Sequence, residues 1–281
     1  MNRILVPYDF SKVADHALEF AVQVAQKAKA KDVMLLNVIE HPSESRLKTM
    51  GASQMDPMEE VYFNQLIKLT KKKLSDRIES AKFPVAVNSK IQLGSPYHKL
   101  AEEVAEEVVD LVVMGSTGAD GVDEMFVGSN AERVVRTANC PVITIKGPAK
   151  LDEIKNIVFA SNYHEVKESF VTQLKALQSM LGAKLHIVKI NTPANFTTQR
   201  HDRKQMEDFV SKFKLENTSI DIYNYTNEED GIIYYADDVN ADMIALGTNQ
   251  RTGFNHFLLG SIAEDVVNHA KRPVWTLRLD L

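Results

Sequence analysis

Short glycine-containing segments follow an apolar run of the chain, and their residue types suit an anionic ligand. Gly115 comes directly after the apolar residues 111–114, Gly118 follows three residues later, and the pair Gly128-Ser129 lies further along. Glycine lets the backbone approach a ligand closely or take positive φ. A helix that begins at such a pair presents unpaired N–H groups and the positive end of its dipole to an anion. The pattern therefore predicts a cradle for phosphate groups.

A carboxylate near the start of the chain could complete this site. Asp9 follows the apolar run 4–7, and an acidic residue at the end of a parallel strand can accept both hydroxyls of a ribose. The glycines could instead make only tight turns, and Ser129 with Glu132 forms a capping box that stabilises a helix start with or without a ligand. The residues alone leave both interpretations open. Neither glycine segment matches the Gly-x-x-x-x-Gly-Lys-Ser/Thr loop, so P-loop hydrolysis is not indicated.

The same pattern occurs twice in the chain. Residues 247–278 repeat residues 115–146 without a gap, and adding 132 to a residue number gives an identical residue at many positions. These positions are Asp110, Gly115, Gly121, Gly128, Ser129, Ala131, Glu132, Val134, Val135, Ala138, Pro141, Val142 and Thr144. The repeat predicts a tandem duplication with domains at 1–147 and 151–281, joined by a short linker at 147–150.

Composition excludes several classes of protein. The 281 residues carry a formal net charge of -5, which provides no basic field for nucleic acid or an anionic membrane surface. We find no uninterrupted apolar run of ~18 residues and no signal-like start, and a lone Cys140 cannot form an internal disulfide. The histidines show no metal-ligand spacing, so no metal site made of side chains is expected. Together these features predict a cytoplasmic protein.

Hydrophobic patterning gives the same fold for each half. Strands are expected at 3–7, 33–39, 85–91, 111–114 and 142–145, and again at 154–160, 185–190, 220–225, 243–246 and 274–279. Helices are expected between them, at 13–28, 58–81, 97–109 and after residue 128, and in the second half from near residues 164, 202, 228 and 261. This order predicts an α/β fold of two tandem, doubly wound, five-stranded parallel sheets with helices on both faces. The last strands of the two halves are expected to pair, because pairing would satisfy two exposed sheet edges.

The spacing of these motifs resembles that of a known family. Gly115, Gly118 and Gly128-Ser129, with Asp9 before them and Cys140-Pro141-Val142 after them, are similar to the ATP-binding branch of the universal stress protein (UspA-like) family. The resemblance covers the whole chain as two family domains in series. It implies the adenine nucleotide alpha hydrolase-like fold with strand order 3-2-1-4-5, dimer contacts through the last strand, and ATP as a ligand of many members.

The resemblance also implies roles for individual residues. Asp9 would hold the ribose, the backbone of Val38 would lie beside the adenine, and Pro7 and Met114 would wall the base. The phosphates would be surrounded by Gly115, Gly118, Gly128, Ser129 and Asn130. The chain departs from the family at Ala119-Asp120, where ATP-binding members often carry a basic residue. Asp120 would repel phosphate, and Lys12 or Arg133 would partly compensate.

The second half departs further from the binding pattern. Gln250 replaces the second glycine, Asn162 replaces Asp9, and Ala160 replaces Pro7. What remains is a weaker second site, made of Gly247, Gly260, Ser261 and Arg251, with Gly260-Ser261 expected to open a helix. We therefore expect one competent nucleotide site and one degenerate, mainly architectural copy.

The function implied is regulatory binding of ATP, ADP or AMP in a stress response. Mg²⁺ is expected to accompany the phosphates, because few side chains are available to neutralise them. No general base or nucleophile can be named, so no catalytic residue is expected. Two alternatives stay open: a nucleotide-independent interaction scaffold, and a slow ATPase or autophosphorylating protein. The protein partner is unknown, and an additional homodimer of the whole chain is compatible with the sequence.

Overall fold

The computed structural model describes residues 1–40, 57–106, 109–116, 129–164, 166–248 and 258–279. The first half contains β1 (Arg3–Pro7), α1 (Lys12–Ala28), β2 (Asp32–Ile39), α3 (Pro57–Ala81), β3 (Val87–Leu93), α4 (Pro96–Glu106), β4 (Leu111–Gly115), α5 (Ser129–Thr137) and β5 (Val142–Ile145). A short 3-10 turn, η1 (Leu151–Glu153), leads into the second half. That half contains β6 (Asn156–Ala160), α6 (Glu168–Leu181), β7 (Lys184–Asn191), α7 (Gln199–Phe213), β8 (Thr218–Asn224), α8 (Glu228–Asp238), β9 (Met243–Thr248), α9 (Leu258–His269) and β10 (Val274–Arg278).

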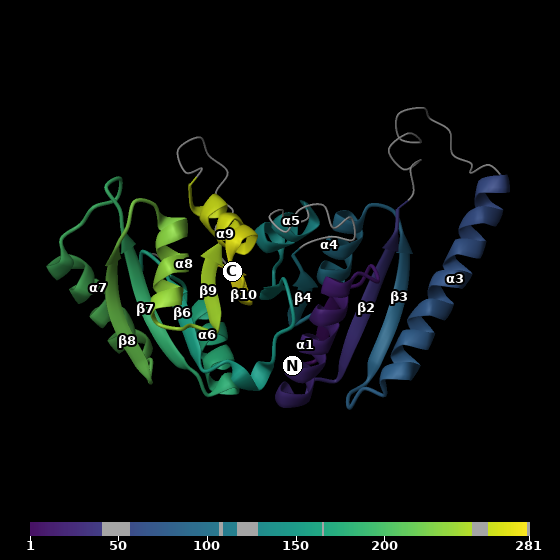
Figure 1. Ribbon diagram of the computed structural model, residues 1–281, viewed down its shortest axis with the longest axis horizontal. Helices are drawn as coiled ribbons and strands as arrows, with labels where there is room; N and C mark the ends of the chain where they lie inside the picture. Colours follow the sequence, from purple (N-terminus) through teal and green to yellow (C-terminus); the bar gives the residue numbers. More distant parts are fainter. Residues whose placement is uncertain (41–56, 107–108, 117–128, 165, 249–257, 280–281) are drawn as a thin grey trace.

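The two halves share one sheet. Its ten strands run in the order β3-β2-β1-β4-β5-β10-β9-β6-β7-β8, so each half has the predicted order 3-2-1-4-5 (Figure 1). Strands within each half pair in parallel, whereas β5 and β10 pair antiparallel, with Ile143 opposite Trp275. The expected pairing of the last strands is thus confirmed. The two predicted five-stranded parallel sheets are therefore parts of one mixed, ten-stranded sheet, in which this pairing covers both inner edges.

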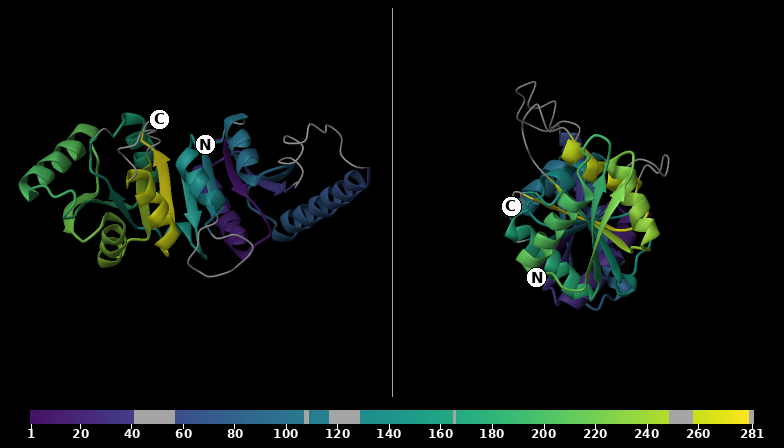
Figure 2. Two further views of the ribbon diagram at one scale, coloured as in Figure 1. Left: turned by 90° about the horizontal axis from the view of Figure 1, so that it is seen from above. Right: turned by 90° about the vertical axis from the view of Figure 1, so that its left-hand side faces the viewer.

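Helices cover both faces of the sheet, as the sequence predicts. On one face, α1, α3, α6 and α7 share a hydrophobic core with the strands, and its members include Phe20, Leu74, Phe170 and Met206. On the other face, α4, α5, α8 and α9 form a second core, and α5 and α9 lie side by side where the halves meet (Figure 1). The view from above and the view from one end in Figure 2 show this layering. The described residues contain no helix that is long and apolar enough to cross a membrane.

Helix α1 shows how local sequence produces these elements. The Ser11 hydroxyl caps the helix by accepting a bond from the Ala14 N–H at 3.1 Å, as a serine N-cap should. Its apolar residues recur on one face and are buried against the sheet, among them Ala14, Ala17, Leu18 and Ala21. The helix ends at Lys29, which takes the left-handed conformation.

Three predicted helix starts in the second half differ from the structure by three or four residues, and one of them is α7, which was expected from near residue 202 and begins at Gln199. We expected a helix from near His164, but α6 begins at Glu168, because Tyr163 takes positive φ and its hydroxyl bonds to the Phe159 and Val188 carbonyls. We expected Gly260-Ser261 to open a helix, but α9 begins earlier, at Leu258. Leucine is a strong helix former, which favours a start at Leu258.

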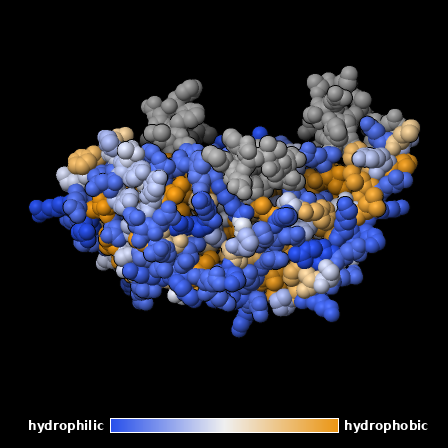
Figure 3. Space-filling view, viewed as in Figure 1, coloured by the Kyte–Doolittle hydropathy of each residue, from blue (hydrophilic) through white to orange (hydrophobic). Residues whose placement is uncertain are grey.

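The face of the molecule seen in Figure 3 is mainly hydrophilic, with several apolar areas, one of them near α3. Figure 3 shows apolar side chains near this helix, at the right of the molecule. The exposed large hydrophobic residues of α3 are Met58, Val61, Tyr62 and Leu69. They lie on a helix at one end of the sheet, next to the edge strand β3, away from the place where the halves meet.

Candidate nucleotide site and its counterpart in the second half

The carboxyl end of β1 leads into Asp9, the residue predicted to bind the ribose. Asp9 is exposed, and its Oδ1 accepts a hydrogen bond from the Ser11 N–H at 2.9 Å. Phe10, between them, takes positive φ and so turns the chain sharply from β1 into α1. Among the described residues, the Ser11 N–H is the only hydrogen-bond donor to this carboxylate. The turn therefore holds Asp9 at the rim of the sheet with an oxygen available to a ligand.

The end of β2 lies directly beside it. Asn37 is buried, and its Nδ2 donates to the Tyr8 carbonyl at 2.7 Å, which ties the ends of the two strands together. Val38 is half-buried and packs against the core on the α4 side. Pro7 is half-buried at the end of β1. The structure thus brings Pro7, Asp9 and Val38 to the same edge.

A polar network under this edge fixes Tyr8. The Tyr8 hydroxyl donates to Asp15 Oδ1 at 2.6 Å, and Arg77 Nε donates to the same oxygen at 2.9 Å. Burial raises the pKa of Tyr8 well above its ordinary value, and the bond to Asp15 raises it further. The Arg77 guanidinium is therefore bonded to Asp15 of α1, which also binds Tyr8, and is not a cation for the phosphates.

Gly115 at the end of β4 has a packing reason as well as a proposed ligand role. A Cβ placed there would lie 2.7 Å from Val13 Cγ1, closer than real side chains approach. The glycine therefore lets α1 pack closely against β4, so its presence alone does not indicate a ligand. Met114, the preceding residue, is buried in the core on the α5 side.

The last predicted component is the first turn of α5. The helix begins at Ser129, as expected, and Asn130 is half-buried. Gly118, Gly128, Ala119 and Asp120 lie outside the described residues. Lys12 and Arg133 are the two cations expected to compensate for the negative charge of Asp120. Lys12 is exposed at the start of α1, whereas Arg133 lies over the Tyr97 ring, 5.5 Å from its centroid.

The second half repeats the turn but not the carboxylate. Asn162 Oδ1 accepts from the His164 N–H at 3.1 Å, and Tyr163 takes positive φ, as Asp9, Ser11 and Phe10 do in the first half. The chain path at the two strand ends is therefore the same. The difference lies in the side chains around it.

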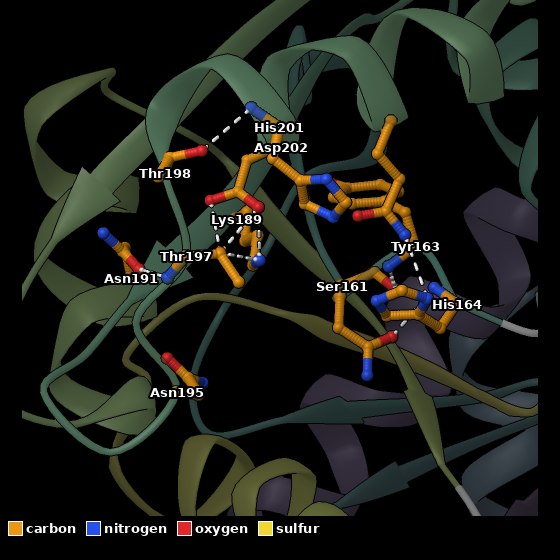
Figure 4. A network of polar contacts seen from close by, with 12 residues as sticks. Ser161, Tyr163, His164, Lys189, Asn191, Asn195, Thr197, Thr198, His201 and Asp202 are labelled. Atoms are coloured by element: carbon orange, nitrogen blue, oxygen red, sulfur yellow. Dashed lines mark hydrogen bonds and ion pairs between the residues drawn. The ribbon is translucent and has the colours of Figure 1, made fainter.

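A buried ion pair fills the adjoining strand end of the second half. By strand register, Lys189 corresponds to Asn37 of the first half. Asn37 follows the residue of β2 that pairs with the last residue of β1, and Lys189 follows the residue of β7 that pairs with the last residue of β6. Lys189 Nζ lies 2.6 Å from Asp202 Oδ1 and 2.6 Å from Thr197 Oγ1, and both Lys189 and Asp202 are buried (Figure 4). The Thr197 N–H donates to Asn191 Oδ1 at 3.1 Å. Residues 192–198 are thereby held over the end of β7.

The remaining second-site residues also have packing roles or lie outside the described chain. A Cβ at Gly247 would lie 2.4 Å from Leu279 Cδ2, so this glycine accommodates the residue that follows β10. Gly260 and Ser261 lie within the first turns of α9. Arg251 and Gln250 are not among the described residues.

Sequence reasoning missed the Lys189, Thr197 and Asp202 cluster. A signal was present, because a lysine interrupts the apolar run 185–190 of a strand that is covered on both faces. Its partner could not be found from spacing, since Asp202 lies on the following helix and is one acidic residue among many.

Comparison with known proteins identifies the family. The sequence profile of the universal stress protein family matches residues 1–146 and again residues 153–278. The chain belongs to the universal stress protein family. Among curated relatives, universal stress proteins MJ0531 and MJ0577 of Methanocaldococcus jannaschii are 27% and 28% identical over 53% and 52% of this chain and 84% and 94% of their own lengths.

Solved structures of tandem length confirm the fold. A universal stress protein from Archaeoglobus fulgidus aligns with a TM-score of 0.75 at 20% identity, covering 99% of this chain and 96% of that one. A putative universal stress protein from Pseudomonas aeruginosa aligns with a TM-score of 0.64 at 19% identity, covering 100% of this chain and 94% of that one. At these identities the likeness shows the fold alone.

Proposed function

We propose that this universal stress protein binds one ATP, ADP or AMP molecule at the carboxyl edge of β1, β2 and β4, and acts as a cytoplasmic stress-response regulator. Residues 1–147 would be the binding domain and residues 151–281 the architectural one. The observation that carries the proposal is the exposed Asp9 carboxylate, held by its turn beside the ends of β2 and β4. A ribose needs such an acceptor, and the start of α5 would offer N–H groups to the phosphates.

The residues of this edge fit an adenine nucleotide in their chemistry. Pro7, Val38 and Met114 would contact the base, Asp9 the ribose, and the backbone at Gly115, Gly118, Gly128, Ser129 and Asn130 the phosphates. Mg²⁺ bound to the nucleotide would add positive charge to that of Lys12, which is exposed at the start of α1.

The second half is proposed not to bind nucleotide. Asn162 lacks the charge of Asp9, and the Lys189–Asp202 pair with Thr197 occupies the neighbouring strand end. Gly247, Gly260, Ser261 and Arg251 would then have an architectural role. Binding of one nucleotide per chain is the quantitative form of this proposal.

Calorimetric titration with ATP and Mg²⁺ tests the proposal with a matched pair of variants. Asp9→Asn keeps an acceptor for the turn, as Asn162 does, but removes the charge, so we expect affinity to fall about tenfold, the value of a charge-assisted bond. Asn162→Asp should leave affinity and the stoichiometry of one unchanged. Equal affinity of Asp9→Asn and the wild type would refute the ribose role, and two sites per chain would refute the asymmetry.

The same preparation separates the alternatives. A wild-type chain that neither carries nucleotide after purification nor binds ATP would be an interaction scaffold. Release of inorganic phosphate from bound ATP, lost in Asp9→Asn, would indicate a slow ATPase.

A further inference from the structure

Helix α3 is longer than its counterpart α7 in the second half. Each helix is followed by a lysine with positive φ, Lys82 after α3 and Lys214 after α7, and these two lysines are 132 positions apart, the spacing of the repeat. By the same spacing, Gln199 at the start of α7 corresponds to Ile67. Residues 57–66 of α3 are therefore an extension that α7 lacks, and Figures 1 and 2 show this end of α3 standing away from the sheet.

The outer face of α3 is apolar, whereas that of α7 is polar. On α3 a set of large apolar side chains is between 58% and 81% exposed, and we call it the outer stripe: Met58, Val61, Tyr62 and Leu69. Every residue of α7 is described, and its exposed side chains are polar or charged, with His201 at the position of Leu69. A polar outer face is normal for a surface helix, so the fold of each half does not require the outer stripe.

The outer stripe has the spacing of a helix that packs against another helix. Met58, Tyr62, Gln65 and Leu69 follow one another at intervals of four, three and four residues. Residues at these intervals lie along one side of a helix, and their alternation is typical of paired helices. A different side of α3 carries its buried residues, which are Phe63, Thr70 and Leu74. Helix α3 therefore has one face for its own core and a second apolar face directed away from it.

The charges along α3 are complementary to those of a second α3 running in the opposite direction. Glu59 and Glu60 are exposed in the first turn. Four exposed lysines follow further along the helix, namely Lys68, Lys71, Lys72 and Lys73. Asp76, which pairs with Lys72, offsets one of these four positive charges. An antiparallel pair places the acidic turn of each helix level with the lysines of the other, whereas a parallel pair would place like charges level.

We propose that the outer stripe of α3 is the surface through which two copies of this chain associate, with the two helices antiparallel and Gln65 near the twofold axis. Val61 of each copy would then lie level with Leu69 of the other, so the two stripes cover each other in the closed symmetry of most homodimers. Two helices that meet over about three turns bury less than the ~1,200 Å² of a standard interface, so the dimer is weak and reversible. This contact lies at the β3 end of the sheet, remote from the β5–β10 pairing.

Sedimentation velocity of the full chain measures this association. We expect the sedimentation coefficient to rise reversibly with protein concentration between about 10 µM and about 1 mM. Leu69→Glu should weaken association at least about tenfold, because an apolar contact is lost and a charge must be buried in its place. The matched control, His201→Glu, changes the corresponding exposed residue of α7 and should leave association unchanged. Equal unfolding midpoints would show that both variants fold.

Thiol cross-linking tests the antiparallel geometry. Cys140 is buried, so the wild type should give no cross-linked dimer with a short bis-maleimide. Gln65→Cys should give one, because the two copies of residue 65 meet near the axis. Met58→Cys should not, because its two copies lie about 21 Å apart along the helices at ~1.5 Å per residue.

Several results would overturn the proposal. These are a chain that stays monomeric at the highest concentration, equal association of Leu69→Glu and the wild type, no cross-linked dimer of Gln65→Cys, and a cross-linked dimer of Met58→Cys. A chain that stays monomeric but binds anionic vesicles would assign the outer stripe to a membrane surface instead. Asp9→Asn should associate like the wild type, so this test is independent of the nucleotide site.

Discussion

The carboxyl edges of the two halves have the same backbone path and differ in the side chains that surround it. In both, the first strand ends in a turn in which a side-chain oxygen accepts from the N–H two residues later and the intervening residue takes positive φ. At the neighbouring strand end, the first half has the neutral Asn37, bonded to a backbone carbonyl, and the second half has Lys189, paired with Asp202. A duplicated fold can therefore keep its chain path while the side chains at a strand end change from a neutral hydrogen bond to a buried ion pair.

The largest expected effect comes from breaking that ion pair. Lys189→Ala leaves Asp202 buried without its partner, so we expect the free energy of unfolding to fall by about 3–5 kcal/mol. The matched change in the first half, Asn37→Ala, removes a single neutral hydrogen bond and should cost about 1–3 kcal/mol. Urea unfolding of both variants measures the difference.

A double variant checks the cause. Lys189→Met with Asp202→Leu removes both charges together and should recover most of the lost stability, because no buried charge is left unpaired. If Lys189→Ala costs no more than Asn37→Ala, the ion pair is not what distinguishes the two edges.

The two strand-end glycines should give the next largest effect. Gly115→Ala sets a methyl group against Val13, which is held in a helix, and we expect a loss of about 1–3 kcal/mol. Gly247→Ala meets the Leu279 side chain, which lies after the end of β10 and can move, so its cost should be smaller. Thermal unfolding of the pair tests this order, and a larger loss for Gly247→Ala would reverse it.

The smallest effect concerns pH and a buried histidine of the second half. His186 lies where the first half has Met34, between Asn156 at 3.1 Å and Ser219 at 3.0 Å, and burial lowers its pKa from the ordinary 6.5. Because the folded chain favours the neutral ring, the unfolded chain binds more protons near and below pH 6.5, and stability falls as pH drops through this range.

The His186→Met variant isolates this contribution. It restores the residue of the first half, so its stability should fall less between pH 7 and pH 5 than that of the wild type, by about 1.4 kcal/mol for each unit of pKa difference removed. Urea unfolding at several pH values gives both slopes. Identical slopes would show that His186 does not contribute.

The fold could be predicted from sequence because it rests on repeated local signals. Apolar runs such as 4–7 and 111–114, the Ser11 cap and the 132-residue repeat each indicate an element or its copy without knowledge of distant contacts. The strand order followed from the family resemblance, and the pairing of β5 with β10 from the need to cover sheet edges. The start of α6 was missed because the buried Tyr163 depends on bonds to two different strands.

The candidate site was harder to predict from the sequence than the fold. Glycine spacing suggested a phosphate cradle, but the structure shows that Gly115 and Gly247 also accommodate Val13 and Leu279, which are remote in sequence from them. The Lys189–Asp202 pair depends on a helix packed over a strand end, and local patterns carry no information about that choice of partner. Sequence thus placed these residues at strand ends but could not tell which distant side chains pack against them.

The antiparallel seam between β5 and β10 has a mechanical consequence. Because one hydrogen-bonded sheet runs from β3 to β8, a change in the twist of either half would pass to the other through the β5–β10 pairing. Trp275, packed in the seam beside Phe170, sits where such distortion would have to pass.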